Sequence, residues 1–201
     1  MKKKNKILLF PLLPILVLIC LVVFNITCCN NSDLDTTHTQ SVVSVELKAM
    51  VKEDQELRMD DSIDYSIINA ADLKHRERVF ELLAQGVIVD PEDLYLAALL
   101  LQHADPSSCR DCYLLAYRLA IEAVNKGFDK ARAMSAKNLD RYLVFSNKPQ
   151  KYGTQYNYDD STSLYYLFPV DSITTDKERL DWNVKPLDSM QAFIDKLNSI
   201  Q

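Results

Sequence analysis

The chain has 201 residues, of which 48% are hydrophobic and 25% are charged. This length and composition fit one folded domain with a tail, and they exclude a wholly disordered chain. The chain has three glycines, Gly86, Gly127 and Gly153. Their wide spacing excludes a Walker A loop and a G-x-G-x-x-G dinucleotide-binding loop. Acidic residues outnumber basic ones by 28 to 23, which argues against a nucleic acid as partner.

The first 28 residues have the pattern of a targeting segment. Four lysines precede an unbroken apolar run over residues 7–24, and polar residues follow. Two interpretations remain open. In one, the segment is a lipoprotein signal, and Cys28 becomes the first mature residue and carries lipid; in the other, it is an uncleaved signal anchor. Both predict an exported protein attached to a membrane of the bacterial cell envelope, with a flexible tether over residues 29–44.

The remainder, residues 45–201, is expected to form a single helical domain. Asp72 and Asp90 are predicted to cap two helices, and Pro91 suits a first helical position. Helical periodicity and stop signals predict five helices in this part of the chain. They cover residues 45–60, 73–85, 91–101, 108–126 and 129–145.

The amino-acid composition changes after Pro149, where aromatic and β-favouring residues predict a hairpin near residues 152–170. A last helix is expected from Pro186. Small residues recur at helical spacing where two helices would cross closely, which suggests one hairpin of the Sel1 or tetratricopeptide type. These small residues are Ala116, Ala120, Ala123, Gly127 and Ala131. The predicted fold class is mainly α, an antiparallel helical bundle with one small C-terminal β-hairpin.

Five short motifs occur in an order that resembles a known family. They are Asp54-Gln55-x-x-Arg58, Gln102-His103-Ala104-Asp105, Asp140-Arg141, Gln150-x-Tyr152-Gly153-Thr154-Gln155 and Asp176-x-x-Arg179. Together they resemble an uncharacterised bacterial family, a domain of unknown function with a Q-x-Y-G-T-Q signature. The resemblance spans roughly residues 45–197. It implies a mostly helical domain with a small hairpin, and it implies no established reaction. The family often has an arginine where this chain has Lys151.

Several of these residues are candidates for chemistry. His103 is the best candidate for a general base, since histidine is the side chain most often used for proton transfer. Asp140 is its candidate partner, and Arg141 suits a carboxylate or phosphate. A structural role in buried pairs and in the hairpin is the alternative for each. The ligand-binding candidates are Gln102, His103, Asp140, Arg141, Gln150, Tyr152, Thr154 and Gln155.

The cysteines give a weaker signal. Cys109 and Cys112 form a C-x-x-C at a predicted helix start, where a disulfide and two free thiols are both open alternatives. Zinc could use His103 with both cysteines, but a fourth ligand is not visible in the sequence. We therefore expect neither a metal ion nor a cofactor.

Two functions remain after these exclusions. The first is an exported, membrane-tethered binding or interaction module for a peptide, a glycan or a partner protein. The alternative is a cell-envelope hydrolase that uses His103 as base and Asp140 as its orienting group, with the signature residues binding substrate. The sequence leaves open whether the protein is an enzyme.

Overall fold

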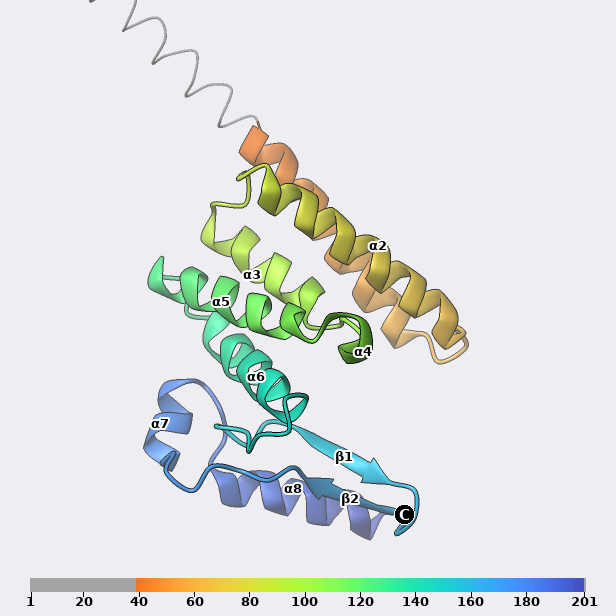
Figure 1. Cartoon of the computed structure of the whole chain (residues 1–201), viewed down its shortest axis with the longest axis vertical. Coiled ribbons are helices and arrows are strands. Elements are labelled where there is room, and N and C mark those ends of the chain that lie inside the picture. Colours follow the sequence, from red (N-terminus) through yellow and green to blue (C-terminus); the bar gives the residue numbers. More distant parts are fainter. Residues whose placement is uncertain (1–38, 201) are drawn as a thin grey trace, which may run out of the picture. The chain divides into compact units, whose positions relative to one another are not determined.

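Residues 39–200 are described by a computed structural model (Figure 1). They are mainly helical, with one two-stranded antiparallel sheet near the C-terminus, which confirms the predicted fold class. A first helix covers residues 39–59. The other elements are α2 (Tyr65–Ala84), α3 (Pro91–Leu101), α4 (Pro106–Cys109), α5 (Asp111–Asn125), α6 (Ala131–Val144), β1 (Tyr156–Asp159), β2 (Leu164–Leu167), α7 (Asp176–Asp181) and α8 (Leu187–Ser199).

The predicted targeting segment, residues 1–28, lies outside the described residues, as does most of the predicted tether. Residues 39–44 of that tether are helical, and Val43 is 4% exposed. The described helix therefore extends further towards the N-terminus than predicted, because an apolar residue in this polar stretch packs into the core. Among the described residues, every helix is too short or too polar to cross a bilayer.

Aspartate caps explain several helix starts. The Asp90 carboxylate accepts a hydrogen bond from the backbone N–H of Glu92 at 2.8 Å, with Pro91 at the first helical position, as predicted. The prediction that Asp72 caps a helix is wrong. The cap is Asp64, so α2 begins at Tyr65 and Asp72 lies inside it. The first turns of α2 are largely exposed and have no apolar stripe that would mark them as helical.

The core contains two hydrophobic clusters. The larger joins the first helix, α2, α3 and α5 and reaches the first residue of α6. α5 packs against both α3 and α6 (Figure 1). The predicted small-residue crossing is confirmed at Ala116, Ala120, Ala123 and Ala131, each fully buried. The smaller cluster forms around Ala136, Tyr152 and Val184. α6 therefore contributes to both clusters.

The predicted hairpin is present but shorter than expected. Tyr156 pairs with Leu167 and Asp159 with Leu164 in an antiparallel register. α8 lies against β2, and the side-chain amide of Asn198 bonds both backbone groups of Tyr165, at 2.7 and 3.0 Å. The prediction begins the first strand near Tyr152, within residues 150–155. Instead these residues form a loop, which is joined to the following chain by a parallel bridge between Gln150 and Val170.

The helix predicted over residues 108–126 is divided at Arg110 into α4 and α5. A disulfide joins Cys109, the last residue of α4, to Cys112 in the first turn of α5. Of the two alternatives for this C-x-x-C, the structure has the disulfide.

Candidate functional site

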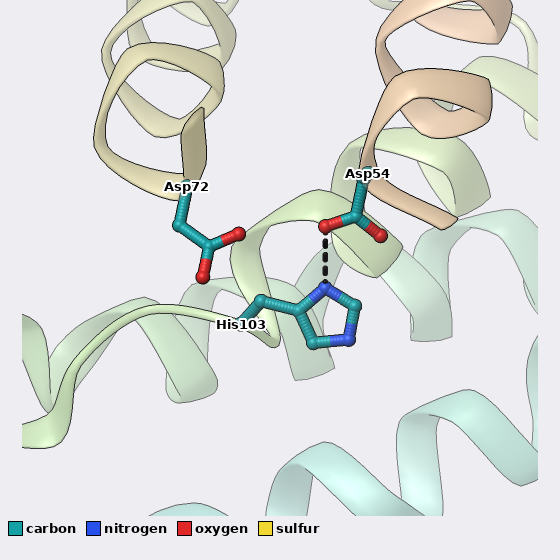
Figure 2. Close-up of side chains that lie close together, drawn as sticks. All are labelled: Asp54, Asp72 and His103. Carbon is teal, nitrogen blue, oxygen red and sulfur yellow. Dashed lines mark hydrogen bonds and ion pairs between the residues drawn. The ribbon is translucent and has the colours of Figure 1, made fainter. Parts of the chain in front are cut away.

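Three segments of the chain bring Asp54, Asp72 and His103 together (Figure 2). Asp54 comes from the first helix, Asp72 from α2, and His103 from the turn that follows α3. Figure 2 shows both carboxylates directed towards the region of the imidazole, with Nδ1 of His103 2.9 Å from Oδ1 of Asp54. Asp54 is 2% exposed, so this contact is shielded from water.

Arg58 completes this cluster. It follows Asp54 by one helical turn, which places both side chains on the same face of the helix. Its Nη2 lies 3.2 Å from Asp54 Oδ1 and 2.5 Å from Asp72 Oδ1. Its Nε lies 3.2 Å from Nδ1 of His103. One guanidinium therefore lies against two carboxylates and a histidine that come from three segments of the chain.

The imidazole has two bonding arrangements in this site. With the proton on Nδ1, it donates to Asp54, and Nε2 can accept from the Gln102 side-chain amide, 3.2 Å away. With the proton on Nε2, Nδ1 can accept from Nε of Arg58. An ionised Asp54 can only accept hydrogen bonds, which favours the first arrangement. In that arrangement Asp54 orients the ring and the lone pair remains on Nε2, the geometry that a general base uses.

The surroundings of Asp54 favour its charged form despite its burial. Burial raises the pKa of Asp54, but hydrogen bonds from His103 and Gln55 and the charge of Arg58 outweigh it. The pKa of Asp54 is therefore held below its ordinary value.

A pocket of about 660 Å³ lies beside this cluster. α2, the turn after α3, α4 and the start of α5 form its walls. Its lining residues include Asp72 and His103 from the cluster, together with Tyr65, Asn69, Arg76 and Tyr113. The His103 side chain is 16% exposed. The volume of the pocket lies in the range of small-molecule binding sites, and the pocket lining offers aromatic, amide and charged groups.

The same three residues have the spacing of metal ligands, because their ligand atoms lie within 4.8 Å of one another. Arg58, however, contacts both carboxylates and neutralises much of their charge. The guanidinium of Arg58 already supplies a positive charge to both carboxylates, so the arrangement gives no reason to propose a metal ion.

Hydrogen bonds connect this cluster to the signature loop, residues 150–155. Nη1 of Arg141 donates to the Gln102 carbonyl at 2.6 Å, and its Nε donates to Oε1 of Gln155 at 3.1 Å. The Gln155 amide donates to Oγ1 of Thr154 at 2.9 Å. Burial lowers the pKa of Arg141, with Tyr113 acting against it. Five of the predicted ligand-binding residues are therefore linked by these bonds: Gln102, His103, Arg141, Thr154 and Gln155.

Asp140 has a different role from the one predicted. Its Oδ1 accepts from the backbone N–H groups of Lys151 and Tyr152, and its Oδ2 accepts from the N–H and hydroxyl of Thr154. These four bonds, of 2.7 to 3.0 Å, wrap the signature loop around one carboxylate. The prediction that Asp140 orients His103 is wrong, because its acceptors are used by the loop and Asp54 contacts the histidine instead.

Gln150 and Tyr152 are also turned inward. Gln150 is fully buried, and its amide bonds the backbone of Gln155 and Phe168 at three points. Tyr152 is 4% exposed, and its carbonyl accepts a hydrogen bond from Arg179. We therefore do not retain either residue as a ligand-binding candidate. Backbone contacts occupy the Gln150 amide, and a ligand would have to break them. The Tyr152 ring belongs to the smaller hydrophobic cluster, beside Trp182.

Sequence reasoning missed Asp72 and most of the pocket lining. Asp72 was assigned to a helix cap, and only the correct start of α2 frees its carboxylate for Arg58. The pattern Asp64-x-Ser66 was the available signal, since an aspartate two residues before a serine is typical of a capping turn. Tyr65, Asn69 and Arg76 had no signal, because they meet only where α2 faces the turn after α3.

Comparison with protein-family models, with curated proteins and with solved structures finds no match to this chain. The resemblance to the Q-x-Y-G-T-Q family and the likeness to a Sel1 hairpin therefore stay predictions.

Proposed function

We propose that this chain is an exported, membrane-tethered ligand-binding protein, and that its ligand occupies the pocket beside His103. The targeting pattern of residues 1–28 supports export, with Cys28 as the proposed site of lipid attachment. One observation supports the binding site most directly. The pocket of about 660 Å³ is bordered by His103, a partly exposed histidine whose Nδ1 lies 2.9 Å from the buried carboxylate of Asp54.

The lining suggests the class of ligand. Tyr65 is 71% exposed, so its ring is available for stacking, and Asn69 and Arg76 supply hydrogen-bond donors. Asp72 and Asp105 supply acceptors. Aromatic faces combined with both donors and acceptors suit a polar, hydroxyl- and amide-rich ligand. For a protein exported to the cell envelope, we propose the glycan and peptide groups of the envelope polymer.

A second candidate is a hydrolase, and the contact between Asp54 and His103 favours it. With the proton of His103 on Nδ1 and bonded to Asp54, Nε2 can take a proton from an attacking water once the Gln102 amide releases it. This revises the predicted pair, since Asp54 takes the place of Asp140.

One experiment tests both candidates. The full chain in detergent is mixed with purified insoluble peptidoglycan, and both the bound protein and the sugar released into solution are measured. We expect the protein to sediment with the polymer and Tyr65→Ala to weaken binding roughly tenfold, as for an aromatic contact residue. Tyr158→Ala removes an exposed tyrosine outside the pocket and should bind like the original chain.

The two candidates differ in the second readout. Binding without release of sugar supports the binding module, whereas release that His103→Ala abolishes, with sedimentation retained, supports the hydrolase. If the original chain does not sediment with peptidoglycan above a protein-only control, the proposed ligand is wrong.

A further inference from the structure

A second pocket, of about 390 Å³, lies at the C-terminal end of the domain. It is bordered by α6, the signature loop, the start of β1, the turn between α7 and α8, and α8 itself. Its lining residues share none with the pocket beside His103. The inference drawn from it therefore does not depend on the function proposed above.

The walls of this pocket are mainly apolar. Tyr156 and Phe193 meet edge to face, with ring centroids 5.6 Å apart, and they are 41% and 40% exposed. Met190, one turn before Phe193 on α8, and the buried Val184 add aliphatic surface. Apolar surface left open to water in this way favours a ligand with an apolar body, because binding removes that surface from water.

The charge of the lining is positive, although the chain as a whole is acidic. The lining contains two lysines, Lys137 and Lys185, and no acidic residue, and neither lysine forms an ion pair within the described part of the chain. The pocket beside His103 contains Asp72 and Asp105, and the one beside His75 contains several glutamates. Two unpaired ammonium groups beside apolar walls complement one anionic group on an apolar ligand.

The turn between α7 and α8 gives a further observation. Asn183 lines the pocket with a backbone φ of 54°, a left-handed conformation that asparagine tolerates better than most residues. This conformation places Asn183, Val184 and Lys185, three consecutive residues, along the same pocket. An amide and an ammonium group therefore both belong to the lining of this pocket.

From this lining we propose that the pocket binds a small organic carboxylate with an apolar, planar body. The ammonium groups of Lys137 and Lys185 face the carboxylate, and Tyr156, Met190 and Phe193 cover the body. Since exposed ion pairs are weak, we expect a small probe to bind with a Kd on the order of 1 mM.

The test uses Met190 as a reporter. The full chain, labelled with ¹³C at its methionine methyl groups and held in nanodiscs of uncharged lipid, is titrated with phenylacetate and with phenylacetamide. Phenylacetamide has nearly the same shape and no charge. We expect phenylacetate to shift the Met190 signal saturably, while Met50, Met59 and Met134, which lie outside the pocket, serve as internal references.

Substitutions then test the charge. Lys137→Gln and Lys185→Gln should each raise the Kd roughly two- to fivefold, whereas Lys196→Gln, which removes a lysine of α8 outside the pocket, should leave it unchanged. The proposal is overturned if Met190 does not respond to about 10 mM phenylacetate, or if phenylacetamide binds equally well. It is also overturned if Lys196→Gln weakens binding as much as the pocket variants do, or if inorganic phosphate alone shifts Met190 to the same extent.

Discussion

At the scale of single residues, the two aspartates Asp54 and Asp140 show how burial and hydrogen bonding divide their roles. Both are at most 2% exposed. Asp54 faces a histidine and an arginine, and its pKa is lowered. Burial raises the pKa of Asp140, because its partners are neutral N–H and O–H groups that offset burial only in part. Asp54 is therefore placed for chemistry, while Asp140 organises a loop.

Asp140→Asn tests this structural role. The amide keeps one acceptor oxygen but turns an NH₂ group towards backbone N–H donors of the signature loop. We expect the free energy of unfolding to fall by about 2–4 kcal/mol, measured by urea denaturation of the full chain in detergent. Asp160→Asn, in the exposed hairpin turn, should change it by less than about 0.5 kcal/mol. Equal effects of the two variants would contradict the role given to Asp140.

At the scale of elements, α6 and the signature loop join the two parts of the core. Three polar residues of α6, Ser135, Asn138 and Asp140, are fully buried. Asp140 binds the loop, and Arg179 of α7 donates to the carbonyl of Tyr152 within it. Gly153 allows this close arrangement, because its φ is 80° and an added Cβ would lie 3.0 Å from Cδ1 of Leu187. The loop thus positions α7, α8 and the hairpin relative to α6.

Gly153→Ala therefore combines a strained backbone with a crowded side chain. We expect it to lower the free energy of unfolding by about 2–3 kcal/mol. Gly86→Ala is the matched control, because its φ of 68° is also positive but an added Cβ meets nothing within 4 Å. It should cost only about 1 kcal/mol. If thermal denaturation shows that both variants lose the same stability, the contact with Leu187 does not contribute to the effect of Gly153→Ala.

At the scale of the whole molecule, acidic residues set how stability depends on pH. Four aspartates, Asp60, Asp64, Asp105 and Asp159, each accept hydrogen bonds from the serine two positions later, and these bonds lower the pKa of each carboxyl. The pKa of Asp54 is lowered as well. A carboxyl whose folded pKa is lowered stabilises the fold above its unfolded pKa, and this contribution is lost as the pH falls through the folded value. Asp140 acts in the opposite sense, since its pKa is raised.

We therefore expect the free energy of unfolding to decrease as the pH is lowered from about 5 to about 3. Asp54→Asn should be less stable than the original chain near neutral pH, and the difference should narrow as the pH falls, because protonation removes the same charge. Urea denaturation at a series of pH values measures both effects. A difference that widens towards acid pH would show that the pKa of Asp54 is raised rather than lowered.

The sequence by itself determined the elements whose signals lie within a few residues of each other. Asp90 and Pro91 predicted the start of α3, and alanine spacing predicted the close crossing at α5 and α6. The aromatic run after Pro149 predicted the hairpin. Capping, periodicity and turn formation depend on neighbouring residues, so one sequence is enough to recognise them. Asp54, Arg58 and His103 could be listed because they belong to the short motifs that resemble a family.

Only the tertiary structure decided which of these residues meet. Asp54 and His103 are 49 positions apart, and their contact depends on how the first helix, α2 and α3 pack. Asp72 joins them only because α2 begins at Tyr65. Asp140 does not, because the signature loop donates hydrogen bonds to its carboxylate. Such contacts follow from the summed packing of the core, in which each single interaction is weak, so no local pattern specifies them.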